Sequence, residues 1–157
     1  MRKKLTTENV EFLIVHASNT NCNQDLSLKD IAKHRATEGY PDIGFHWVIS
    51  RDGFTRQGIN ISEAGTHTPR FDAISIGILL VGGKTTRGKP SDNFTQAQKA
   101  SLVALFDLLT TRFPNASIVG VSDIVGGTNP NFNVRELYES SIKSPKASEG
   151  KQKDNIS

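Results

Sequence analysis

The fold is decided by the stretch Phe12-Leu13-Ile14-Val15-His16-Ala17-Ser18, which begins with four apolar residues and then carries a histidine. A short apolar run between polar segments is typical of a strand that is buried on both faces. We therefore expect a buried strand that brings the His16 imidazole to the edge of a sheet. A histidine in such a place is more often structural than a ligand, so the rest of the chain has to decide its role.

The residues around this strand predict an alternation of strands and helices. A second apolar run over residues 74–81 predicts another central strand, which Gly82 and Gly83 end. Asp52 and Gly53 predict a tight hairpin turn, because an Asp-Gly pair supplies the positive φ angles that such a turn needs. The predicted strands cover residues 12–18, 45–50, 54–57, 74–81 and 117–121.

Helices are predicted where capping residues precede apolar residues at helical spacing. Ser27 with Asp30 opens a helix over residues 28–38, and Thr95 with Gln98 opens a longer one. The longer helix has an apolar stripe typical of core packing, formed by Leu102, Leu105, Phe106, Leu109 and Phe113. A last short helix is expected up to about residue 140. This alternation predicts an α/β protein with a central mixed β-sheet flanked by helices.

The length and composition fit a single domain. The chain has 157 residues, of which 36% are hydrophobic and 22% charged, as is usual for a globular protein. We expect an N-terminal arm over residues 1–10, one domain over residues 11–140, and a flexible polar tail over residues 141–157, which has almost no apolar content. A monomer is the expected state.

The charge pattern argues against a nucleic-acid partner. The formal net charge is +3, but residues 1–4 carry +3 and residues 141–157 carry +2, so residues 5–140 carry −2. No apolar segment follows the basic start, so no signal peptide and no membrane span are expected, and the predicted location is the cytoplasm. Cys22 is the one cysteine, which excludes an internal disulfide and a multi-cysteine zinc site.

Five stretches resemble one known family. They are VHAS at 15–18, GFHWVISRDG at 44–53, AGTHT at 64–68, SIGILLVGG at 75–83 and NFTQAQ at 93–98. In order and spacing they are similar to the type 2 N-acetylmuramoyl-L-alanine amidases, zinc enzymes whose family includes the peptidoglycan recognition proteins. The nearest resemblance is to the lysozymes of short-tailed bacteriophages, which combine amidase activity with inhibition of the phage RNA polymerase. The resemblance implies an amidase fold in a phage-encoded protein.

The resemblance also implies a zinc site made by two histidines and one cysteine, with an open position for the attacking water. His16 matches the first ligand. Val121 stands where the second histidine is expected, and Asn129 stands where the cysteine is expected. Valine has no lone pair to donate, and an amide oxygen is a poor zinc ligand compared with a thiolate. We therefore expect no metal cofactor in this chain.

Other positions depart from the family pattern as well. Phe45 replaces a tyrosine and Gly127 replaces a lysine, so two groups that would stabilise the reaction are missing. Ile74 replaces an asparagine of the groove. The expected ligand groove consists of His16, His46, His67, Thr68, Arg70 and Asp123. In the family layout His46 and His67 are not zinc ligands, so a different metal site built from these histidines and Asp123 is not favoured.

Three functions remain open. The first is a pseudoenzyme that binds peptidoglycan fragments without hydrolysing them. The second is a protein-binding regulator that docks on a phage or host protein such as RNA polymerase. The third is an endolysin, that is, an active N-acetylmuramoyl-L-alanine amidase with an altered site. The missing ligands favour binding without catalysis.

Overall fold

A central sheet positions the candidate site. Within residues 2–143, which a computed structural model describes, this sheet has five strands in the order β4-β3-β5-β1-β7. Their bounds are Phe12–Ala17 for β1, Trp47–Ile49 for β3, Thr55–Gln57 for β4, Ser75–Leu80 for β5 and Ser117–Gly120 for β7. β3, β5, β1 and β7 are parallel, and β4 pairs with β3 antiparallel. The predicted mixed sheet is confirmed.

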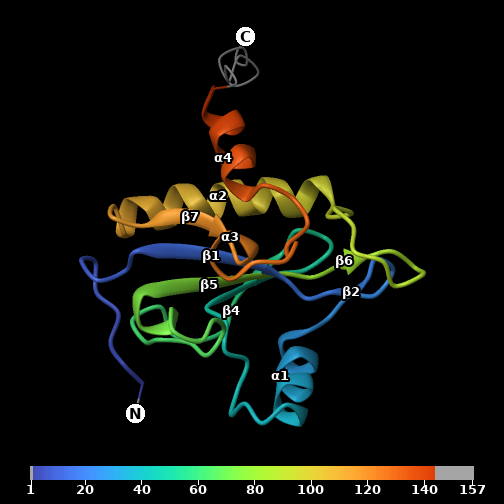
Figure 1. The fold of residues 1–157 in the computed structure, drawn as a ribbon, viewed down its shortest axis with the longest axis horizontal. Coiled ribbons are helices and arrows are strands. Elements are labelled where there is room, and N and C mark those ends of the chain that lie inside the picture. The colour runs from blue at the N-terminus through green and yellow to red at the C-terminus, as the bar shows by residue number, and fades with distance from the viewer. Residues whose placement is uncertain (1, 144–157) are drawn as a thin grey trace.

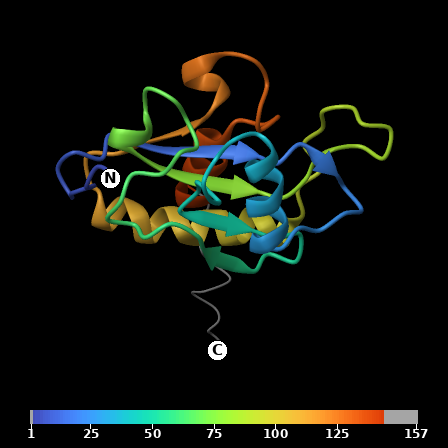
Figure 2. The ribbon, with the colours of Figure 1, turned by 90° about the horizontal axis from the view of Figure 1, so that it is seen from below.

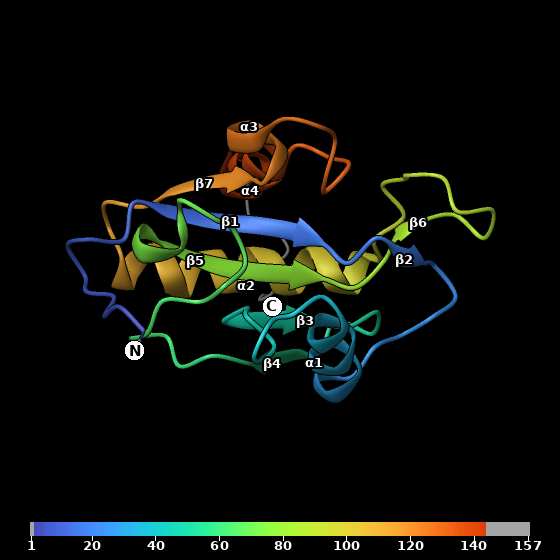
Figure 3. The same cartoon turned by 60° about the horizontal axis from the view of Figure 1, so that its bottom comes forward.

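Helices cover both faces of the sheet, as predicted. α2 (Gln96–Arg112) and α4 (Val134–Lys143) lie on one side, and α1 (Leu28–Thr37) lies on the other (Figure 1). When the molecule is turned, α1 is seen in front of the strands and α2 behind them (Figure 2 and Figure 3). A short helix, α3 (Ser122–Val125), begins one residue beyond the end of β7. The sheet is therefore the middle layer of three.

The alternation of side chains along β1 decides which way His16 points. Leu13, Val15 and Ala17 belong to the core cluster that also contains the apolar stripe of α2. Successive residues of a strand point to opposite faces, so Ile14 and His16 face the side of α1 and α3. Ile14 packs there against Val119 and Val121. The apolar stripe that the sequence predicts for α2 is buried, as expected.

Several boundaries differ from the sequence-based expectations. Residues 19–25 lie outside the strands and helices predicted from the sequence, yet they contain a short strand, β2 (Thr20–Asn21). It pairs in parallel with β6 (Gly83–Lys84) through backbone bonds that need no apolar side chains. Ile74 ends a 3-10 helix, η1 (Asp72–Ile74), and does not begin β5. α4 continues three residues into the expected tail, because Tyr138 packs against Phe106 of α2 and holds the helix there. The rest of that tail, residues 144–157, lies outside the described residues.

The N-terminal arm is packed on the domain. The backbone N–H of Leu5 donates to the Ser62 carbonyl, and the Ala64 N–H donates to the Lys3 carbonyl, both at 2.8 Å. Leu5 and Val10 are buried. No helix in the described part of the chain is long and apolar enough to cross a membrane.

Gln98 caps α2 and also joins this helix to the sheet through hydrogen bonds of its side chain. The predicted capping boxes at Ser27 and Thr95 are both present. In addition, Gln98 is fully buried, and its Nε2 donates to the carbonyls of Ile49 at 3.1 Å and Val81 at 2.8 Å. One side chain thus caps a helix and pairs the carbonyl groups at the ends of two strands.

We expect Gln98→Leu to lower the free energy of unfolding by about 2–4 kcal/mol, since it removes a helix cap and two buried hydrogen bonds to strand carbonyls. Urea denaturation at neutral pH measures this loss. Gln96→Leu is the matched control, because Gln96 is exposed in the first turn of the same helix. Equal effects of the two substitutions would contradict the role assigned to Gln98.

Candidate functional site

The candidate site lies at the edge where the parallel strands end. His16 is the penultimate residue of β1, and Val121 directly follows β7. The Val121 N–H donates to the Val15 carbonyl at 3.0 Å, which continues the pairing of the two strands. Because the carboxyl ends of parallel strands meet at one edge, residues far apart in the sequence come together here.

A hydroxyl joins two histidines at this edge. Thr68 Oγ1 lies 2.8 Å from His16 Nε2 and 2.7 Å from His67 Nδ1. The hydroxyl has one hydrogen, so it donates to one ring and accepts from the other. His67 Nε2 is buried without a partner among the described residues, and an unpaired N–H is rarer in proteins than an unpaired acceptor. Asp72 Oδ1, 3.6 Å from His67 Nδ1, also favours a proton on that nitrogen.

These contacts assign the direction of the hydrogen bonds. His67 Nδ1–H donates to Thr68 Oγ1, and the Thr68 hydroxyl donates to His16 Nε2. His16 therefore uses Nε2 as an acceptor and carries its proton on Nδ1. The backbone N–H groups of His67 and Thr68 both donate to Asp72 Oδ1, at 2.9 and 2.8 Å, so the turn that holds the hydroxyl is itself anchored.

His46 lies behind this pair and outside the groove to which it was assigned from the sequence. It is fully buried, its Nδ1 accepts from the Gly77 N–H at 3.0 Å, and its Nε2 donates to the Glu63 carbonyl at 2.6 Å. Its ring lies 5.7 Å from the ring of His67. With both nitrogens bonded to backbone, His46 supports the site and has no ring nitrogen free to bond a ligand.

Burial keeps these histidines neutral at neutral pH. Burial, followed by the positive charge of Arg35, lowers the pKa of His16 to about 4. Burial also lowers the pKa of His46 to about 4, although the bond to the Glu63 carbonyl opposes the shift. The pKa of His67 is well below its ordinary value, again mainly through burial.

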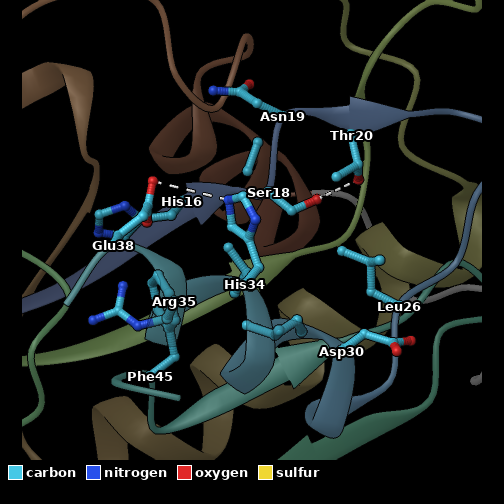
Figure 4. A pocket seen from close by; sticks show the side chains of 13 residues that line it. His16, Ser18, Asn19, Thr20, Leu26, Asp30, His34, Arg35, Glu38 and Phe45 are labelled. Atoms are coloured by element: carbon cyan, nitrogen blue, oxygen red, sulfur yellow. Dashed lines mark hydrogen bonds and ion pairs between the residues drawn. The ribbon is translucent and has the colours of Figure 1, made fainter. Parts of the chain in front are cut away.

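Two cavities lie beside the hydrogen-bonded group of His16, Thr68 and His67. The first, of about 390 Å³, lies between the end of β1 and α1 and includes His16, Arg35 and Phe45 in its wall (Figure 4). The second, of about 570 Å³, is mostly apolar. Its lining is formed by His67, Thr68, Pro69, Arg70, Phe71, Val121, Ile124 and Val125. Residues near the position that the sequence resemblance gives to a metal thus line spaces of ligand size.

Arg35 is a functional candidate that the sequence analysis missed. It is buried, its Nε donates to the Asp42 carbonyl at 3.2 Å, and its Nη2 donates to Thr66 Oγ1 at 2.9 Å. The guanidinium carbon lies 4.0 Å from the centre of the Tyr40 ring. The available signal was its position four residues after Ile31, on the side of α1 that packs on the sheet.

Two other predicted groove residues lie elsewhere. The Asp123 carboxylate is outside both cavities and accepts from the Gly120 N–H at 2.8 Å, so it holds the turn into α3. Ile74 also lines neither cavity. Arg70 does line the second cavity, with an unusual φ of 77° that turns the chain there.

Comparison with known proteins decides the family. The family profile described as N-acetylmuramoyl-L-alanine amidase matches residues 6–131. The chain belongs to this amidase family. The endolysin of Klebsiella phage KP32 is 30% identical over 127 residues, which cover 81% of this chain and 84% of that one. The predicted resemblance to phage amidases and peptidoglycan recognition proteins is thereby confirmed.

Solved amidase-family structures share the fold. The amidase LysC from Clostridium intestinale URNW superposes with a TM-score of 0.72 at 22% identity, covering 88% of this chain and 89% of that one. A point mutant of Drosophila PGRP-LB, solved in complex with tracheal cytotoxin, has a TM-score of 0.67 at 19% identity, covering 92% of this chain and 86% of that one. At these identities the likeness concerns the fold.

At the three positions that the sequence resemblance assigns to zinc ligands, the side chains present do not form a ligand set that fits the metal. His16 Nε2 is bonded to Thr68, and Val121 is an apolar side chain buried against Ile14 and Val119. Asn129 Oδ1 accepts from the Ala17 N–H at 2.7 Å, and its Nδ2 donates to the Ala17 carbonyl at 3.1 Å. Within residues 2–143 no group of three or more His, Cys, Asp or Glu side chains is arranged to hold a metal ion.

The positions of the amidase family's two helper residues offer no reactive group either. The Phe45 ring lies 5.1 Å from the ring of His16 in a T-shaped arrangement, so the position that the sequence resemblance gives to a tyrosine holds a ring without a hydroxyl. Gly127 is exposed with a φ of 87°, and a Cβ built on it would meet nothing within 4 Å. Space exists at this position, but the backbone favours glycine.

Proposed function

We propose that this protein binds peptidoglycan fragments on an amidase fold without hydrolysing them through zinc. The observation that carries the proposal is the state of the three ligand positions. One nitrogen of His16 and both polar atoms of the Asn129 side chain already have partners within the protein, and Val121 offers no donor atom. Hydrolysis by this family's chemistry needs a metal with an open position, which these residues do not supply.

The two cavities support a retained binding function. Each joins apolar walls to a few polar groups, which is the usual character of a ligand site. PGRP-LB, which shares this fold, was solved with tracheal cytotoxin bound, and the relative from Klebsiella phage KP32 is an endolysin. A peptidoglycan fragment has carboxylate groups that suit Arg70, and apolar side chains that suit the wall near α3.

Cosedimentation with insoluble peptidoglycan tests binding. Val125 is 57% exposed and lines the second cavity, and Val125→Asp is expected to weaken cosedimentation at least about fivefold, because it places a carboxylate in an apolar wall. Leu108→Asp is the matched control, since Leu108 is 60% exposed on α2, away from both cavities. Wild-type protein that remains in the supernatant would contradict the binding proposal.

Hydrolysis and metal content test the pseudoenzyme part of the proposal. We expect zinc well below one atom per chain by elemental analysis, and no lytic band on a peptidoglycan zymogram with added zinc. A lytic band that His16→Ala abolishes would instead establish an endolysin with an altered site. If the protein neither lyses nor binds peptidoglycan but captures RNA polymerase in stoichiometric amount from lysate, the regulator function replaces the proposal.

A further inference from the structure

Asn129 forms a two-bond bridge between a loop and the end of β1. Its carboxamide donates to one polar backbone group of Ala17 and accepts from the other, at 3.1 and 2.7 Å. This arrangement copies the way one strand residue pairs with another. Ala17 is only 6% exposed, and no strand in the described part of the chain bonds to its N–H and carbonyl groups. The Asn129 side chain therefore takes the place of a neighbouring strand.

The loop over residues 126–131 is fastened at further points beside this bridge. The Asn129 carbonyl accepts from the Ser122 N–H at 2.9 Å, and Asn131 Nδ2 donates to the Gly83 carbonyl at 2.9 Å. Pro130 is buried against Gly120, where an added Cβ would come within 2.7 Å of the proline Cδ. Hydrogen bonds and packing therefore join this loop to β1, β7 and β6.

In a zinc amidase the metal would join these same segments, since its ligands come from the positions of His16, Val121 and Asn129. A bound metal stabilises the fold that assembles its ligands. We propose that the carboxamide bridge from Asn129 to Ala17 takes over this fastening role, so that the attachment of the 126–131 loop is independent of metal.

Amide hydrogen exchange at Ala17 tests the bridge directly. Asn129→Ala leaves both backbone groups of Ala17 without a partner, so we expect exchange at the Ala17 N–H to accelerate at least about 100-fold and Tm to fall by roughly 5–10 °C. Asn131→Ala, in the same loop, keeps the bridge. The Ala17 N–H should therefore exchange much more slowly in Asn131→Ala than in Asn129→Ala. Asn115→Ala, at an exposed turn, should leave Tm within about 1 °C.

Chelation tests metal independence. The Tm of the wild type is expected to stay within about 1 °C in EDTA and in equimolar zinc. The double variant Val121→His/Asn129→Cys rebuilds the family's donor set with His16, and its Tm is expected to rise with zinc and fall with EDTA. A wild-type Tm that falls in EDTA, or an Ala17 amide that exchanges as slowly in Asn129→Ala as in the wild type, would overturn the inference even if the double variant does not fold.

Discussion

Replacing Gly77 by alanine is expected to lower the free energy of unfolding by about 3 kcal/mol or more, because no space exists for the added methyl group. A Cβ on Gly77 would meet the ring of His67, with Nε2 only 2.7 Å away. That ring cannot move aside easily, since its Nδ1 is bonded to Thr68 and its face stacks on Phe45 at 5.8 Å. The Gly77 N–H also donates to His46, which holds the strand in place.

Urea denaturation of three single variants and one double variant measures this effect. Gly88→Ala is the control, because a Cβ there meets nothing within 4 Å and only the positive φ of 80° opposes alanine, at a cost of about 1 kcal/mol. In a His67→Ala background the ring is gone, so Gly77→Ala should then cost less than about 1 kcal/mol. Undiminished destabilisation in that background would show that the ring does not cause it.

The second large effect is a loss of stability in mild acid. His16 and His46 have a pKa of about 4 in the folded protein, and the pKa of His67 is also well below its ordinary value of 6.5. The unfolded chain therefore binds protons at these histidines more readily than the folded one. Stability is fully present above pH 6.5 and falls as the pH is lowered from 6.5 to 4.

The slope of stability against pH measures the number of histidines involved. If all three bind a proton only on unfolding, the free energy of unfolding falls by about 4 kcal/mol per pH unit near pH 5.5, or about 1.4 kcal/mol for each histidine. His46→Gln is expected to remove one third of that slope. His34→Gln is the control, because the His34 side chain is 75% exposed. A flat profile between about pH 6.5 and 5 would contradict the burial of these rings.

Protonation of carboxylates lowers the stability in a separate, more acidic pH range. Hydrogen bonds from the Ser27 backbone and side chain lower the pKa of Asp30, and bonds from Phe54 and Ser50 lower that of Asp52. Their contribution is present above the ordinary pKa of 3.8 and is lost as the pH falls further. A loss of stability that begins near pH 6.5 therefore reports the histidines and not these residues.

The sequence by itself determined the features that depend on local pattern and on residue chemistry. Apolar runs predicted the central strands, capping residues predicted the starts of α1 and α2, and the stripe of α2 predicted its buried face. These strands, helix starts and buried stripe follow from interactions between residues that are close in the sequence. The unsuitability of Val121 and Asn129 as zinc ligands was also readable, because a side chain's donor atoms do not depend on the fold once the resemblance has placed them.

Only the tertiary structure decided how the site is arranged, because its contacts join residues far apart in the chain. Thr68 lies between His16 and His67, Gly77 makes room for the His67 ring, and Asn129 completes the end of β1 at Ala17. The sequence placed His46 in the groove, whereas packing buries it with both nitrogens bonded to backbone. Strand order and register set these distances, and no periodicity along the chain encodes which side chains meet across a sheet.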